Sequence, residues 1–344
     1  MTGNHKNINP NFRRTPAPQY THAEIVEGVK NRDAKILGHI ISKAESTIDK
    51  DQDLVYEVLD QIAIEQRSSI IAVSGSPGVG KSTFINSFGN HLVQQGKSIA
   101  VLPVDPTSQV SKGSILGDKT RMDDLVKLKG AFIKPMSSSL SLGGVAPATL
   151  LASMICEKAG FDYILIETVG VGQSEFEARF MCDCFMLLLQ PGGGDDLQGI
   201  KRGIMEMADL LVVNKADGGL LDKARNSLQS YKAALKLLLP NSMGWRAKAY
   251  LYSSIEHQGQ LELFEALSDY FEYLNQHNRW SVLRRDQSIY LFEKYTNDIM
   301  HQTLLQNQGL KKDYNDLIDA LQEGSISINK ALTRFKEKLQ DELS

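Results

Sequence analysis

The chain has 344 residues, 42% of them hydrophobic, which is enough for one large α/β domain with helical additions or for two modest domains and excludes a disordered protein. Its 38 basic and 41 acidic residues give a net charge of −3, so no basic excess indicates a nucleic-acid partner. No segment reaches the roughly 18 consecutive apolar residues that a membrane-spanning helix needs, and the N-terminus has no apolar region typical of a secretory signal. We expect a soluble protein without a membrane partner.

The three cysteines, Cys156, Cys182 and Cys184, are an odd number in a chain that shows no secretory leader, which favours a reducing, cytoplasmic location. Cys182 and Cys184 flank Asp183, and together they could be half of a metal site. Because no second cluster of cysteine or histidine accompanies them, we favour the edge of a strand.

Residues 1–20 are rich in Asn, Pro, Arg and Thr and have no periodicity, which predicts a mobile tail. Thr21 can cap a helix that runs through Val29, and two further apolar groups with helical spacing follow. These groups are Ile36, Ile40, Ile41 and Ala44, then Leu54, Val58, Leu59 and Ile62. We expect residues 21–67 to form two or three short helices that cover one edge of the next domain; a separate binding module is the alternative.

From Ser69 onwards, short apolar runs rich in β-branched residues alternate with helical stretches. The predicted strands are 70–73, 99–104, 132–134, 163–166, 185–189, 210–213 and 249–252. Such runs are typical of strands buried on both faces, and their alternation with helices predicts an α/β domain over residues 68–277 with a mainly parallel central sheet. Ligands of such sheets bind at the carboxyl ends of the strands.

The first predicted strand leads into the segment GSPGVGKST, and a helical pattern follows. This order is typical of a P-loop, in which glycines let backbone N–H groups converge on phosphate oxygens at the positive end of a helix. Lys81 is expected to contact the β- and γ-phosphates and Ser82 to bind Mg²⁺. An ordinary glycine-rich turn is the alternative, which the strand and helix on either side disfavour. The candidate phosphate-binding residues are Gly75, Ser76, Pro77, Gly78, Val79, Gly80, Lys81, Ser82 and Thr83.

Carboxylates follow two other predicted strands. Asp105 comes directly after 99–104, Asp118 lies in a polar loop farther along, and Glu167 comes directly after 163–166. P-loop enzymes hold Mg²⁺ with a carboxylate at such a position, directly or through water, and a nearby glycine N–H can contact the γ-phosphate. A helix cap is the alternative for Asp118. The candidate metal ligands are Ser82, Asp105 and Glu167, and the candidate glycine is Gly170.

The strand 210–213 ends in the tetrad NKAD. A carboxylate that accepts from the N1–H and 2-amino groups of guanine is satisfied by GTP, whereas ATP would leave it unpaired. Asp217 is therefore expected to select GTP over ATP, while Asn214 ties its loop to the P-loop and Lys215 lies along the base. The residues expected to present a backbone N–H to guanine O6 are Ser253, Ser254 and Ile255.

The sequence shows no obvious apparatus for fast hydrolysis. In Ras-like GTPases a glutamine follows the glycine of the second switch, but here Val171 has that position and Gln173 comes two residues later. Gln173, or a carboxylate of a partner, could orient the attacking water. The alternative is that Gln173 only begins a helix.

The chain beyond Leu261 has helical periodicity throughout. One helix carries Phe264, Leu267, Phe271 and Leu274, a long helix is predicted at 279–302, and two amphipathic helices are predicted at 313–321 and 328–339. An appendage of this size either packs on its own domain or contacts a second chain. We assign residues 278–344 to a separate C-terminal arm.

Taken together, the motifs GSPGVGKST, DPTS, GSILGDKTRM, ETVGVGQSE, GGGDDLQGIKRGIMEMAD and NKADG resemble those of the MeaB/ArgK/MMAA-type GTPases, metallochaperones of adenosylcobalamin-dependent acyl-CoA mutases. The resemblance runs in order from about Gly28 to the C-terminus. It implies a homodimeric GTPase that uses GTP, GDP and Mg²⁺, gates cofactor loading, and protects or reactivates methylmalonyl-CoA mutase. In this family the C-terminal helices form a dimerisation arm.

The resemblance also implies roles for individual residues. Carried over by motif, Lys81 and Ser82 serve the phosphates and Mg²⁺, Asp105 and Asp118 belong to the first switch, and Glu167 belongs to the second switch.

Segment 192–203 corresponds to the third switch, which in the family communicates with the mutase. The chain departs from the family at two places. It has Ser253-Ser254 where the family usually has Ser-Ala, and Gly193-Gly194, where members often have Ala-Gly, would loosen the third switch.

Two other classes of function stay open at this point. One is a kinase that phosphorylates a transport-system binding protein, an older assignment of ArgK-like sequences, and the other is a nucleotide-sensing scaffold without significant turnover. The residues do not decide between a methylmalonyl-type and an isobutyryl-type mutase.

Overall fold

The computed structural model describes residues 19–46, 48–105, 122–137, 147–168, 174–192 and 202–343. Several predicted features lie outside these residues: the tail up to residue 18, Asp118, Gly170, Gln173 and the segment 193–201. Asp105 is described by its backbone alone.

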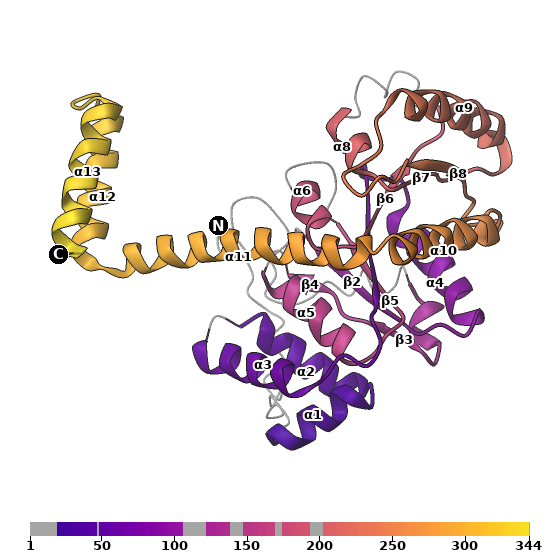
Figure 1. Ribbon diagram of the computed structural model, residues 1–344, viewed down its shortest axis with the longest axis horizontal. Helices are drawn as coiled ribbons and strands as arrows, with labels where there is room; N and C mark the ends of the chain where they lie inside the picture. Colours follow the sequence, from indigo (N-terminus) through magenta and orange to yellow (C-terminus); the bar gives the residue numbers. More distant parts are fainter. Residues whose placement is uncertain are drawn as a thin grey trace, which may run out of the picture.

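An eight-stranded sheet forms the centre of the molecule, and each strand pair in it is parallel (Figure 1). The strand order is β3-β2-β5-β1-β6-β7-β8, and β4 also pairs with β2. The strands are β1 (Ser69–Gly75), β2 (Ile99–Asp105), β3 (Ala131–Ile133), β4 (Met136–Ser137), β5 (Tyr163–Glu167), β6 (Cys184–Leu189), β7 (Leu210–Val213) and β8 (Lys248–Leu251). The α/β prediction and all seven predicted strands are confirmed. Strand β4 was not predicted, because two residues are too few to show a periodicity.

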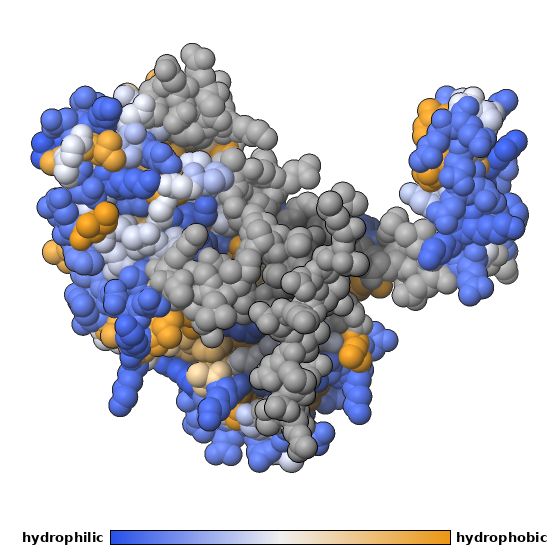
Figure 2. All heavy atoms as spheres, turned by 180° about the vertical axis from the view of Figure 1, so that it is seen from behind, coloured by the Kyte–Doolittle hydropathy of each residue, from blue (hydrophilic) through white to orange (hydrophobic). Residues whose placement is uncertain are grey.

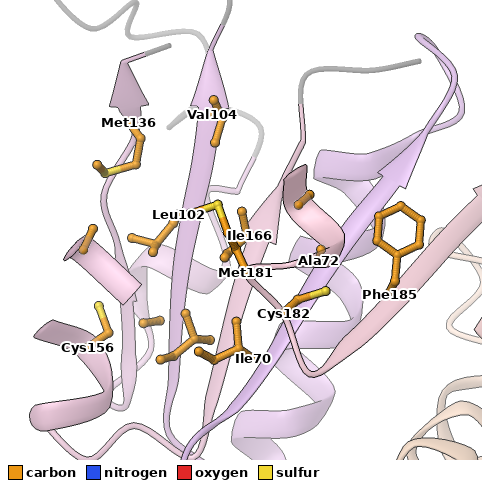
Figure 3. Close-up of a cluster of buried hydrophobic side chains, with 14 of the residues drawn as sticks. Ile70, Ala72, Leu102, Val104, Met136, Cys156, Ile166, Met181, Cys182 and Phe185 are labelled. Carbon is orange, nitrogen blue, oxygen red and sulfur yellow. The ribbon is translucent and has the colours of Figure 1, made fainter. Parts of the chain in front are cut away.

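Strand β1 lies between β5 and β6, with side chains buried on both faces of the sheet. Ile71 and Val73 pack in one hydrophobic cluster, and Ile70 and Ala72 pack in the other (Figure 3). Because both faces are covered, the strand reads in the sequence as an uninterrupted apolar run rather than an alternating one.

Helices cover both faces of the sheet (Figure 1). The apolar sides of α4 (Lys81–Gln94) and α10 (Gln260–Gln276) contribute to one cluster. The helices on the other face, which contribute to the other cluster, include α5 (Pro147–Lys158), α6 (Ser174–Arg179), α8 (Arg202–Met207) and α9 (Leu221–Leu237). Two 3₁₀ turns, η2 (Leu125–Lys127) and η3 (Gly218–Leu220), lie in connections.

The N-terminal helices are α1 (His22–Lys30), α2 (Ala34–Ala44) and α3 (Asp49–Gln61). Thr21 caps α1 as predicted, and Glu24 completes a capping box, since its carboxylate accepts from the Thr21 N–H at 2.7 Å. Their apolar residues share one hydrophobic cluster with α5, and α2 packs against α5. The three helices therefore pack on the nucleotide domain through α5.

Strand β6 begins at Cys184, so the sequence around Cys182 is the edge of a strand, as favoured above. Both thiols are buried, and burial raises the pKa of Cys182 to about 12, which keeps this thiol protonated. Among the described residues no group of three or more His, Cys, Asp and Glu side chains could hold a metal ion.

The C-terminal helices are α11 (Arg279–Gln306), α12 (Gln308–Gln322) and α13 (Ile328–Leu343). Helix α11 starts on the domain and runs outward, and α12 and α13 form a hairpin at its far end (Figure 1). The side chain of Asn307 caps α12, and the rings of Tyr314 and Phe335 pack at 5.8 Å inside the hairpin. Within the described residues, no helix has the length and apolar character needed to cross a membrane.

Arg284 anchors the first turns of α11 at the amino ends of β1 and β6. Its Nε and Nη2 donate to the two carboxylate oxygens of Asp183 at 2.5 and 2.8 Å, and Nη2 also contacts Glu157 and the Ser68 carbonyl. Asp183 is fully buried and accepts from the Ile70 N–H at 2.9 Å. Burial raises the pKa of Glu157, and the charge of Arg284 opposes this rise. The start of α11 is thus part of the domain core.

Replacing Arg284 with alanine should destabilise the fold by about 3–5 kcal/mol, because the buried carboxylate of Asp183 would lose the partner of its ion pair. Urea unfolding followed by circular dichroism measures this loss. The matched control is Arg285→Ala, which removes an exposed contact with Asp286 and should cost about 1 kcal/mol or less. Equal unfolding midpoints for the two variants would contradict the anchoring role.

Candidate nucleotide-binding site

The turn between β1 and α4 has the geometry that a P-loop requires. Gly75 has a φ of +149°, and a Cβ there would lie 2.5 Å from the Leu188 carbonyl oxygen. Gly80 has a φ of +95° at the N-terminus of α4, and a Cβ there would lie 2.9 Å from the Asn214 Nδ2. Only glycine fits these two positions. The backbone of the turn can therefore lie close to Leu188 and Asn214, and the N-terminus of α4 stays accessible to an anion.

Two side chains at the start of α4 occupy the places expected of phosphate and metal ligands. Lys81 reaches back across the loop, and its Nζ donates to the Gly75 carbonyl at 2.9 Å. The Ser82 hydroxyl donates to the Glu167 carboxylate at 3.0 Å. Glu167 ends β5 and lies opposite Val73 of β1, so the pairing of these strands brings the carboxylate to the P-loop.

The loop after β7 is held against the P-loop by two hydrogen bonds. Asn214 is buried, and its Nδ2 donates to the Val79 carbonyl at 2.9 Å, the tie predicted from the sequence. Lys215 has a φ of +57°, and its Nζ donates to the Gly78 carbonyl at 2.6 Å. The two loops therefore form one continuous rim at the carboxyl ends of the strands.

Buried serines after β8 fix two side chains of the N-K-x-D loop. The Ser253 hydroxyl donates to the Asp217 carboxylate at 2.6 Å, and the Ser254 hydroxyl donates to the Asn214 side-chain oxygen at 3.0 Å. The sequence predicted only backbone contacts for these serines, and it did not predict the hydrogen bonds of their hydroxyl groups. The Ser253 N–H donates to the Gln258 carbonyl at 3.0 Å, so of the three predicted backbone donors this one is already used within the protein.

The structure thus brings most candidate residues together at one edge of the sheet. The residues joined by the hydrogen bonds above are Gly75, Gly78, Val79, Lys81, Ser82, Glu167, Asn214, Lys215, Asp217, Ser253 and Ser254. The backbone of Asp105 ends β2, two residues beyond the Pro103 that pairs with Glu167, so it reaches the same edge. Asp118, Gly170 and Gln173 lie outside the described residues.

A P-loop on a parallel sheet, joined to an N-K-x-D loop, defines the class of the P-loop GTPases. The chain belongs within this class to one family: the profile described as "Methylmalonyl Co-A mutase-associated GTPase MeaB" matches residues 37–309. The protein is therefore a GTPase of the MeaB family, and the resemblance stated from the motifs is confirmed.

Similar proteins agree with this assignment. The chain is 37% identical to the GTPase ArgK of Escherichia coli (strain K12) over 321 residues, which cover 93% of this chain and 97% of ArgK. It is 41% identical to the Methylmalonic aciduria type A homolog, mitochondrial, of Mus musculus, over 76% of this chain and 70% of that protein. The crystal structure of LAO/AO transport system kinase matches with a TM-score of 0.74 and 30% identity, over 93% of this chain and 97% of that chain. The mouse relative is named mitochondrial, and a cytoplasmic location for this chain stays a prediction.

Exchanging Asp217 for asparagine should weaken GTP and admit xanthosine triphosphate, because the amide replaces an acceptor by a donor. Loss of one bidentate base contact costs about 1–3 kcal/mol, or roughly 5- to 150-fold in Kd. Displacement of a fluorescent GDP analogue measures both affinities. Asp222→Asn, an exposed acid at the start of α9, is the control and should bind GTP normally. Unchanged GTP affinity in Asp217→Asn would show that another group reads the base.

Proposed function

We propose that this GTPase serves an adenosylcobalamin-dependent acyl-CoA mutase, methylmalonyl-CoA mutase, by gating cofactor loading and by protecting or reactivating the mutase. The observation that carries the proposal is the family match over residues 37–309, whose description names association with this mutase. The mouse relative, named for methylmalonic aciduria, points the same way. The hydrogen bonds that join the P-loop to the N-K-x-D loop support a role that depends on GTP.

The arrangement of the site supports specific roles for its residues. Lys81 and the backbone N–H groups at the start of α4 would bind the β- and γ-phosphates of GTP. The Ser82 hydroxyl and the Glu167 carboxylate, 3.0 Å apart, are the oxygen ligands that Mg²⁺ prefers, so the pair fits this ion. Bound there, Mg²⁺ would neutralise charge on the phosphate oxygens during transfer. Asp217, held by Ser253, would select guanine.

Hydrolysis by the free protein should be slow, because an apolar residue, Val171, follows Gly170 where Ras-like GTPases have glutamine. We expect about 10⁻⁴ to 10⁻² s⁻¹ without a partner, the range of unassisted GTPases. Purified methylmalonyl-CoA mutase should raise this rate, measured as phosphate release from GTP. Lys81→Ala is the control and should show no turnover with or without the mutase, since the phosphates lose the lysine of the loop.

The same assay decides between the proposal and a kinase, which the name of the similar transport system kinase structure keeps as a second candidate. With GTP labelled at the γ-phosphate, a GTPase releases the label as inorganic phosphate, whereas a kinase leaves it on an acceptor protein. No acceleration by the mutase, or a free rate above about 1 s⁻¹, would contradict the proposed function.

We also propose that the C-terminal arm joins two copies of the chain. Exposed apolar side chains recur along the arm, and Figure 2 shows hydrophobic residues among the hydrophilic ones on the outlying hairpin of α12 and α13. They are Ile289, Phe292, Ile299 and Met300 on α11, Tyr314 and Ile318 on α12, and Ile328 and Leu332 on α13. A single chain that exposes this many apolar groups is typical of an interaction surface.

Removing residues 307–344 should convert a dimer into a monomer, because the cut discards the hairpin and its apolar surface. Multi-angle light scattering measures the mass of the full and shortened chains. Nucleotide binding should persist, since the cut leaves the Arg284 anchor and every strand in place. A shortened chain that is still dimeric would place the interface elsewhere, for example on α11.

A further inference from the structure

Helix α6 and the two residues after it lie between the nucleotide site and the C-terminal helix α11. On one side lies the end of β5, where Ile166 precedes Glu167 and the Glu167 carboxylate accepts from the Ser82 hydroxyl of the P-loop. On the other side, residues Phe180 and Met181 pack toward the sheet and α11, and Figure 3 shows Met181 among the buried side chains of the sheet face near Ile166. Met181, two residues after α6, thus lies in the same buried cluster as Ile166, the residue before Glu167.

Two side chains of α11 hold α6. The ring of Tyr290 stacks on Phe180, with ring centroids 3.7 Å apart and planes 17° from parallel. Lys294 forms an ion pair with Glu177 of α6, and the side chains are only 24% and 13% exposed, so water screens the pair weakly. Because Tyr290 and Lys294 are four residues apart, they lie on one face of α11.

This face of α11 is fixed to the domain at its other end. Arg284 is bound to Asp183 as described, and the side chain of Gln287 donates to the Cys182 carbonyl at 2.5 Å. Leu291 is buried in the same cluster as Ala178 of α6. The spacing of these residues, three to four apart, makes one continuous stripe that leads from the base of the sheet to α6.

A second charged contact holds the end of α6 from another direction. Arg179 approaches Asp209 at 3.5 Å, with side-chain exposures of 14% and 0%. Asp209 precedes β7 and also accepts from the Phe185 N–H and from Asn241. Ion pairs thus fix α6 at both Glu177 and Arg179. Of these two pairs, the one between Glu177 and Lys294 depends on the C-terminal part of the chain.

We infer that Tyr290 and Lys294 of α11 are positioning residues for GTP hydrolysis, acting through α6 on the end of β5 where Glu167 meets the P-loop. Tyr290 contacts Phe180 and Lys294 contacts Glu177, and their effect passes through these two residues. The inference rests on the GTPase activity of the family and not on the identity of the partner.

The test is single-turnover GTP hydrolysis by full-length Lys294→Ala and Tyr290→Ala without any mutase. The hydrolysis rate should fall by about 3- to 100-fold, since small displacements of catalytic groups have effects of this size. The Kd values for GTP and GDP should change less than about twofold, because the P-loop and Asp217 are untouched. Lys294→Arg, which keeps the charge and the reach to Glu177, should restore most of the rate.

The control is Lys338→Ala, which removes the ion pair of Lys338 with Asp313 in the hairpin, far from α6, and should leave the rate unchanged. Glu177→Ala combined with Lys294→Ala should be no slower than either single variant, as expected for two residues that act through one contact. Light scattering checks that the oligomeric state is the same for all variants.

Three results would overturn the inference. The first is a wild-type rate in both Lys294→Ala and Tyr290→Ala. The second is a loss of nucleotide affinity and of thermal stability that parallels the loss of rate, which would show a purely structural contact. The third is an additive loss in the Glu177 and Lys294 double variant.

Discussion

The nucleotide site depends on the close contact between the P-loop and the loop after β7. Asn214 can donate to the Val79 carbonyl at 2.9 Å only because Gly80 has no Cβ, which would lie 2.9 Å from the same amide nitrogen. The contact is buried, so an unpaired amide or carbonyl there would be costly. It joins the P-loop to the N-K-x-D loop, and Ser254 holds the other end of the Asn214 side chain.

The sheet supplies the second constraint. Because its strands are parallel, their carboxyl ends meet at one edge, and the pairing of β1 with β5 brings Glu167 to Ser82. The contacts of Arg284 lie at the opposite, amino ends of the strands. There α11 is attached to Ser68, just before β1, and to Asp183, just before β6. The nucleotide site therefore lies at the carboxyl ends of the strands, and α11 is attached at their amino ends. From there α11 runs to α6.

This arrangement changes how the C-terminal arm is understood. The sequence suggested a boundary near residue 278, but the first half of α11 shares its polar contacts and its buried Leu291 with the domain. The part that stands apart is the outer half of α11 with α12 and α13 (Figure 1). The same helix is therefore both an element of the domain core and the stem of the arm.

The sequence by itself determined the elements whose signals are local. Continuous apolar runs indicated seven strands, and Thr21 with its capping pattern indicated the start of α1. The P-loop and NKAD motifs predicted phosphate binding and a carboxylate that reads guanine. Each of these signals depends on residues that are neighbours in the chain. Only the tertiary structure decided the strand order, the hydroxyl contacts of Ser253 and Ser254, and the ion pairs of Arg284 and Lys294. The partners of these ion pairs lie 101 and 117 residues away in the chain. No periodicity or spacing marks such partners, since they meet only after the sheet and α11 have packed.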